Sequence, residues 1–180
     1  MPNSLGDQTI YLGQTGLPTT FNSPDLYAGG QLGQVFEKNQ ATYQLVKCDS
    51  GATANTATGA VAATQLAFIK DPSQYIVTNN SPQALGGQVA NAYRNFVAGV
   101  FLTSVTAGNY CFIQQRGVGV SVKSAASGGV GQIAVANSGT DANVTHLSVG
   151  GNITYLPLGV ERAAASGSAI SVDLNIPSIP

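Results

Sequence analysis

The chain has 180 residues, and its seven Lys and Arg and eight Asp and Glu together make up only 8% of it, with a formal net charge of −1. An average soluble domain carries about 25% charged residues. So few basic residues argue against nucleic acid as a partner, because that binding depends on Lys and Arg neutralising phosphates. At this length one core can bury roughly 70% of the unfolded chain's surface, so a single domain needs no metal or disulfide to fold.

A surface with so little charge consists mainly of Ser, Thr, Asn, Gln, Gly and backbone groups, and copies of the chain repel one another weakly. We interpret it as a surface that other subunits cover; the alternative is a neutral polar surface left in solvent. The first residues, MPNSLGDQTIYLG, lack the basic and apolar regions of a secretory leader. The apolar run at 60–69 is too short and too polar to span a bilayer, so no membrane partner is expected.

The first 34 residues are expected to form an extended, loop-rich N-terminal arm. They hold three prolines and six glycines, and their apolar residues follow neither a helical nor a strand period. A segment of this kind has too few apolar contacts to fold alone. Its apolar and aromatic side chains are therefore candidates for contact with another subunit: Leu5, Ile10, Tyr11, Leu12, Leu17, Phe21 and Tyr27.

Strand signals dominate after the arm. Val35–Glu37 and Thr42–Lys47 are expected to form a hairpin with its turn at Lys38-Asn39-Gln40, and the runs TGAVAATQLAFIKD and SQYIVTNN predict further strands. Residues 81–96 have apolar residues at helical spacing, but they include two adjacent glycines, each costing about 1 kcal/mol inside a helix. We expect a loop there with at most one or two helical turns.

The run GVFLTSVTAGNYCFIQQRGVGVSV at 99–122 predicts strands at Gly99–Val105 and Tyr110–Gln115 around the turn TAGN, where Gly108 can adopt positive φ. Strict alternation in GVGVSV at 117–122 places its three valines on one face. Further short strands are expected in GQIAVAN and THLSVGGNITYLPLG. The tail SGSAISVDLNIP also alternates, and its expected inward residues are Ile170, Val172, Leu174 and Ile176.

These elements together predict an all-β fold. The expected architecture is a single β-barrel or sandwich of short antiparallel strands over residues 35–180, preceded by the extended arm of residues 1–34.

Few residues are arranged for metal or thiol chemistry. His146 is the only histidine, which excludes a two-histidine metal site within one chain. A lone histidine on a strand is more often a hydrogen-bonded structural residue than a catalytic one. Cys48 and Cys111 both lie in expected strands, where a cysteine usually acts as a small buried hydrophobe, so we expect two free thiols.

Acids mostly stand beside bases, as in Glu37-Lys38, Lys70-Asp71 and Glu161-Arg162, with Lys47 near Asp49; we interpret them as solvated turn charges. Gly129–Ala134 matches the pattern GxGxxA, but the strand-like IAVAN replaces the helix that a dinucleotide site requires, so a turn is expected.

A catalytic site needs titratable groups that converge or a metal. Two carboxylates brought together by the fold, as in a glycosidase, stay an open alternative, although the chain has no Trp to form a sugar platform. We expect neither an enzyme nor a cofactor.

Three stretches carry a resemblance to a known family: GQVFEKNQATYQLVKCDS, AGVFLTSVTAGNYCFIQQRGVGVSVKSA and LGVERAAASGSAISVDLNI. They resemble the small head proteins of tailed bacteriophages, in which a YxLV strand, an AGV…TAGNYxFIQ…G strand pair and a closing SG…I.V.L strand recur. The matching positions are Tyr43–Val46, Ala98–Gly117 and Ser166–Leu174, and the resemblance covers most of residues 33–176. The N-terminal arm matches no pattern of the family.

The resemblance implies a decoration, or cement, protein that binds the outer surface of an icosahedral capsid and bridges its capsomers. The implied partners are the major capsid protein and further copies of this chain, commonly as a homotrimer. The implied location is the outside of the virion after synthesis in the host cytoplasm. The main alternative is another virion component, such as a fibre, spike or tail module that binds a carbohydrate or receptor.

Overall fold

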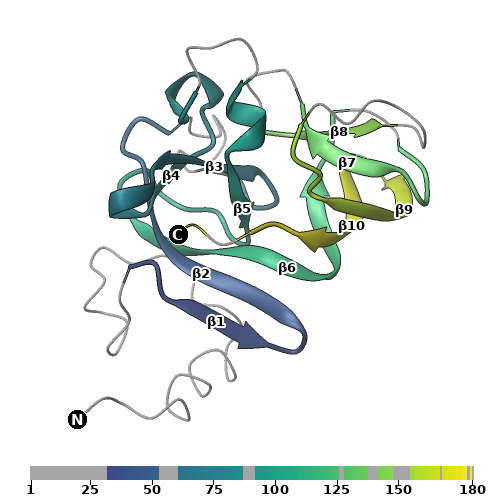
Figure 1. Ribbon diagram of the computed structural model, residues 1–180, viewed down its shortest axis with the longest axis horizontal. Helices are drawn as coiled ribbons and strands as arrows, with labels where there is room; N and C mark the ends of the chain where they lie inside the picture. The colour runs from purple at the N-terminus through teal and green to yellow at the C-terminus, as the bar shows by residue number, and fades with distance from the viewer. Residues whose placement is uncertain are drawn as a thin grey trace.

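The computed structural model describes residues 32–52, 61–86, 92–125, 128–137, 142–147, 155–166, 168–177 and 179. These residues form ten strands and three single-turn 3₁₀ helices (Figure 1), which confirms the expected all-β class. The strands are β1 Val35–Lys38, β2 Ala41–Cys48, β3 Leu66–Asp71, β4 Ile76–Thr78, β5 Val97–Phe101, β6 Tyr110–Lys123, β7 Ile133–Ala136, β8 Val144–Leu147, β9 Gly159–Ser166 and β10 Ala169–Asn175; the 3₁₀ helices are η2 Pro72–Gln74, η3 Ser81–Gln83 and η4 Ala92–Asn95.

Five of the strands close a β-barrel. Their order is β2-β4-β3-β5-β6, and an additional pairing of β6 with β2 closes the ring. Strand β1 lies outside this ring, antiparallel to β2. The pairing of β2 with β4 is parallel, whereas only antiparallel pairs were expected. It arises because β4 turns back from β3 through η2 and inserts between β3 and β2.

Strand β6 is 14 residues long and pairs with two groups of strands within the one ten-stranded sheet. Its first half pairs with β2, and its second half pairs with β10. From β10 the sheet continues through β9 and β7 to β8. A single parallel bridge between Ser124 and Val144 then brings β8 back to the end of β6. The protein is therefore a barrel and a second ring of strands that share β6 (Figure 1).

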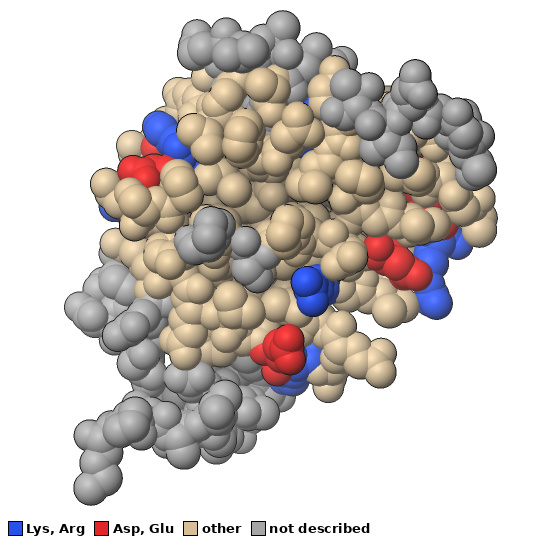
Figure 2. Space-filling model, in the orientation of Figure 1, with Lys and Arg blue, Asp and Glu red and all other residues tan. Residues whose placement is uncertain are grey.

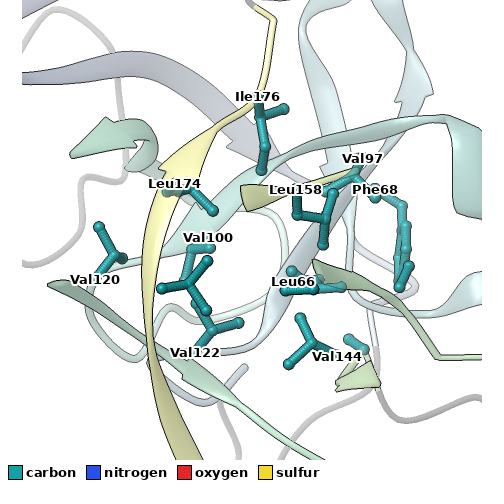
Figure 3. Packing of buried hydrophobic residues seen from close by; sticks show 14 of the residues in the cluster. Leu66, Phe68, Val97, Val100, Val120, Val122, Val144, Leu158, Leu174 and Ile176 are labelled. Carbon is teal, nitrogen blue, oxygen red and sulfur yellow. The ribbon is translucent and has the colours of Figure 1, made fainter. Parts of the chain in front are cut away.

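Apolar side chains fill both the barrel and the space between the two rings. On β3, Ala67 belongs to the cluster inside the barrel, whereas Leu66 and Phe68 face the second ring. There they pack among Leu158, Val122 and other residues of the larger cluster (Figure 3). A third, smaller cluster of Phe36, Leu45 and Phe112 lies beneath β1. Because side chains alternate along a strand, the two faces of β3 contribute to the two larger clusters.

The hairpin and the final strand agree with the sequence analysis. Strands β1 and β2 pair in register across a turn in which Asn39 and Gln40 both have positive φ, the geometry of a tight hairpin. On β10, Ile170, Val172 and Leu174 are buried as expected. Residues 81–86 and 92–96 contain only the short helices η3 and η4, as expected for that region.

Two strand predictions need correction. The strand expected at Gly99–Val105 ends at Phe101, and Val105 instead forms an isolated bridge with Val61. In β6, the three valines do not share a buried face, because Val118 is 60% exposed. The cause is a bulge: the pairing of β6 with β10 shifts register, and Gly119 has a φ of 67°. A bulge of this kind re-aims the neighbouring side chain.

Two buried glutamines fix the C-terminal segment to the barrel. Gln115 Nε2 donates to Gln44 Oε1 at 2.7 Å, and both side chains are inaccessible to solvent. Gln44 Nε2 donates to Gly33 O at 3.0 Å and to Ile179 O at 3.3 Å, while Ile179 N donates to Gln44 Oε1 at 3.3 Å. The side chain of Ile179 enters the barrel core. The beginning of the described chain and its C-terminal end therefore meet at one side chain.

Candidate functional site

The seven arm residues predicted to make capsid or inter-subunit contacts lie outside the described residues. The same is true of most of the arm, because the structure describes the chain from residue 32. The candidate site described below lies on the two rings of strands.

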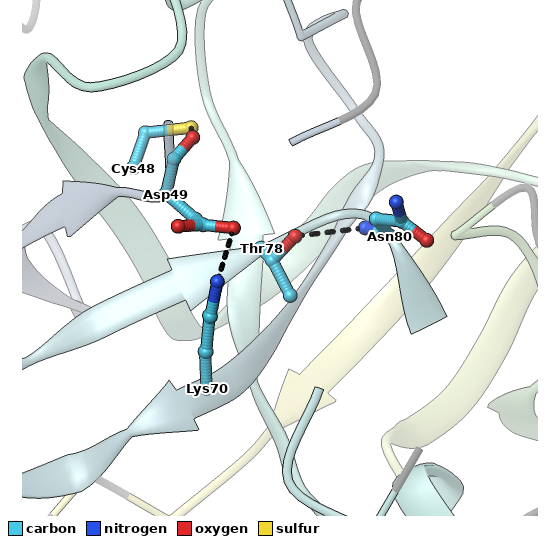
Figure 4. Close-up of polar contacts among 5 residues, drawn as sticks. All are labelled: Cys48, Asp49, Lys70, Thr78 and Asn80. Carbon is cyan, nitrogen blue, oxygen red and sulfur yellow. Dashed lines mark hydrogen bonds and ion pairs between the residues drawn. The ribbon is translucent and has the colours of Figure 1, made fainter. Parts of the chain in front are cut away.

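The acids were interpreted as solvated turn charges, and for two of them this was wrong. Asp49 is 6% exposed and Glu161 is 1% exposed. Asp49 Oδ2 forms an ion pair with Lys70 Nζ at 2.8 Å, linking the end of β2 to β3 (Figure 4). The amide nitrogen of Gln83, in the orientation that satisfies both its polar ends, also donates to Asp49 Oδ2 at 2.7 Å. This group holds strands together and offers no reactive atom.

Glu161 belongs to a different cluster, formed with Ser124 and His146. His146 Nδ1 contacts Glu161 Oε1, and His146 Nε2 lies 3.2 Å from Ser124 Oγ. The side chain of Glu161 is 0% exposed and that of His146 is 7% exposed, whereas Ser124 is partly buried. The three groups thus form a chain of polar contacts that runs from the interior toward the surface.

The second ring of strands brings these residues together. Ser124 follows the end of β6 and bridges to Val144 at the start of β8. His146 lies two residues further along β8, opposite Ala134 of β7. Strand β7 also pairs with β9, which carries Glu161. The site depends on closure of this ring, since each residue comes from a different strand or its end.

A glycine packs directly against the acid and the imidazole. A Cβ at Gly128 would collide with Glu161 Oε2 and His146 Nδ1, so the pair leaves no room for a side chain at this position. Glu161 Oε2 is buried and has no hydrogen-bond partner among the described residues. The carboxylate is therefore held by one oxygen on the imidazole, with its other oxygen against the backbone of Gly128.

This arrangement has the connectivity of a nucleophile, a base and an orienting acid. A carboxylate at Nδ1 directs the lone pair of Nε2 toward the serine hydroxyl, which is the relation that activates serine in acyl transfer. The backbone donors nearest Ser124 are already used, however. Ser124 N donates to Ser168 O, and Ala125 N donates to Val144 O, both as part of strand pairing. Neither N–H can stabilise an oxyanion on a bound substrate without breaking a strand contact.

The two cysteines are buried and free, as the sequence predicted. Burial and the neighbouring Asp49 raise the pKa of Cys48 to about 12. Burial likewise raises the pKa of Cys111 well above its usual value, and Cys48 adds to the effect. Both thiols are therefore protonated at neutral pH, and neither is a nucleophile in the folded protein.

Two shallow grooves lie elsewhere on the surface. One, of about 290 Å³, is lined by residues of β5 and β6, including Gln114 and Val118. The other, of about 370 Å³, is formed by the β1–β2 hairpin and Arg116. Neither includes a residue of the serine cluster. Within the part of the chain that the structure describes, three or more His, Cys, Asp or Glu residues nowhere group as a metal site would require.

This cluster could not be predicted from the sequence, because its members lie 22 and 15 positions apart and match no motif. His146 was expected to be hydrogen-bonded, and it is. The burial of Glu161 could not be predicted from its neighbours in the sequence, because an acid next to Arg162 has the pattern of an exposed ion pair.

Comparison with known proteins identifies no relative of the chain. No family model matches it, and neither the curated proteins nor the solved structures include a match. None of the helices that the structure describes has the length and apolar character needed to cross a membrane.

Proposed function

We propose that the protein is a structural virion component: a decoration protein that binds the outer surface of an icosahedral phage capsid and stabilises it by bridging capsomers. The observation that carries the proposal is the sequence resemblance over residues 33–176 together with the scarcity of surface charge. The partners in this proposal are the major capsid protein and other copies of the chain, assembled as a homotrimer.

The distribution of charge supports the proposal. On the face shown in Figure 2, charged side chains form small, separate groups on a mostly uncharged surface. Several charges are neutralised within the protein, such as Lys70 by Asp49 and Arg162 by Asp173. A surface of this kind favours close packing against other subunits, because repulsion between neighbouring copies is small.

The arrangement of the two rings of strands, which form the body of the protein, also supports the proposed role as a decoration protein. Two rings of strands that share β6 form a stiff unit, and buried Gln44 joins Gly33 to Ile179. Gly33, near the end of the proposed arm of residues 1–34, therefore lies next to the C-terminal segment. An arm and a body that contact different capsomers would bind far more tightly together than either alone, since the second contact forms at high effective concentration.

The test is binding to capsids of the phage whose genome encodes the chain, prepared without this protein. We expect full-length protein to sediment with the capsids and to raise the temperature at which they break open. A variant lacking residues 1–30 should remain folded and soluble but occupy fewer sites at equal concentration. Size-exclusion chromatography with light scattering shows whether the deletion also dissolves the oligomer, and absence of full-length protein from the capsid fraction would refute the proposal.

A further inference from the structure

The cluster of Ser124, His146 and Glu161 has features that strand cohesion alone does not require. The carboxylate contacts Nδ1 of the imidazole and the hydroxyl lies at Nε2, 3.2 Å away. The acid at one end of the cluster is fully buried, whereas His146 and Ser124 are both residues of intermediate exposure. A serine activated for attack needs this arrangement, with the acid shielded from water and the hydroxyl within reach of a reactant.

We propose that Ser124 is a reactive nucleophile that accepts acyl groups from small activated carboxylic esters. Ser124 Oγ forms a bond to the ester carbonyl carbon while its proton moves to His146 Nε2. The ester C–O bond then breaks, and the alcohol leaves with that proton. Glu161 keeps the imidazole in the required orientation and stabilises its positive charge while the proton is held. Water releases the acyl group by the same route, with His146 again taking and returning the proton.

The backbone around Ser124 makes acylation slow compared with a true hydrolase. The amides of Ser124 and Ala125 donate to strand carbonyls, so they do not stabilise the oxyanion. Loss of one oxyanion donor costs about 100-fold to 1,000-fold in rate. A positioned general base still contributes about 100-fold or more. The expected behaviour is therefore selective acylation of one serine, with slow release of the acyl group.

Small electrophiles are the appropriate reactants. Ser124 is only partly accessible, and neither the groove on β5 and β6 nor the groove at the β1–β2 hairpin extends to it. An acetyl ester of a good leaving group or a short-chain fluorophosphonate requires no extended binding pocket. Weakly activated esters lack the oxyanion stabilisation that they would need, because the amides of Ser124 and Ala125 are already used.

The experiment uses a small alkyl fluorophosphonate on the full-length native protein, with peptide mapping by mass spectrometry. Ser121 is the internal control, because it lies on β6 three residues before Ser124 and is exposed. We expect the adduct on Ser124 to form at least tenfold faster than any adduct on Ser121. S124A should abolish the main adduct, S121A should not change it, and E161Q should slow it at least tenfold while the circular dichroism spectrum is unchanged.

Two results would overturn the proposal. One is the absence of an adduct on Ser124 under conditions that label a known serine hydrolase, or equal labelling of Ser124 and Ser121. The other is a folded E161Q variant that reacts as fast as the natural chain. Should E161Q fail to fold, the ratio of Ser124 to Ser121 labelling in the unmodified protein decides the question, since it requires no substitution. Loss of this proposal leaves capsid binding untouched, because the two are measured separately.

Discussion

Ile179 stands at the end of the described chain but behaves as a core residue of the barrel, and replacing it with Ala tests that role. Its side chain is 4% exposed and packs in the cluster inside the barrel. Removing a buried Ile side chain to Ala costs about 2–5 kcal/mol. Ile179 lies outside the regular strands, where the backbone can relax around the gap, so we expect about 2–3 kcal/mol for I179A. In a protein of this size, that lowers the melting temperature by roughly 4–12 °C.

Urea denaturation followed by circular dichroism measures this change, with V130A as the matched control. Val130 is 73% exposed, so its truncation should change the free energy of unfolding by less than about 0.5 kcal/mol. The slope of the free energy against urea should be the same in both variants. If I179A is as stable as V130A, the C-terminal segment does not complete the barrel core, and the role given to Gln44 in holding it is wrong.

Three further outcomes are expected. G128A should destabilise the protein by about 1–3 kcal/mol in urea, because the added Cβ would collide with the buried carboxylate of Glu161. G129A should not destabilise it, since the atom nearest to a Cβ at that position is 3.9 Å away. Cys48 and Cys111 should resist a thiol-disulfide reagent at pH 8 until urea unfolds the chain, because burial raises the pKa of each thiol; rapid reaction of the folded protein would contradict this. D173N should lower the free energy of unfolding in urea by less than about 1 kcal/mol, because the ion pair of Asp173 is exposed. A larger loss would show that this ion pair contributes more to stability than its exposure indicates.

The local sequence pattern was sufficient to predict the strands in which apolar and polar residues alternate and the hairpin with a tight turn. The β1–β2 hairpin and the buried face of β10 follow from residues adjacent in sequence, so the sequence predicted them. In β6 the same kind of prediction was wrong because of the bulge at Gly119. Strict alternation of buried and exposed side chains assumes that every residue of the strand is paired. A glycine that adopts positive φ interrupts the period without any change in hydrophobicity.

Contacts between distant parts of the chain could not be predicted in this way. The sharing of β6 by two rings depends on pairings with β2 and β10, which lie far apart in sequence. The burial of Glu161 likewise depends on His146, which reaches it only when β7 joins β8 to β9. Periodicity reports which face of a strand is apolar, but it does not report which strand lies beside it.

The most direct test of the structural role is the amount of this protein in purified virions, measured by quantitative mass spectrometry against the major capsid protein. Our account predicts a fixed ratio, with a copy number comparable to that of the capsid protein, that survives repeated gradient purification. A few copies per particle, or none, would contradict it.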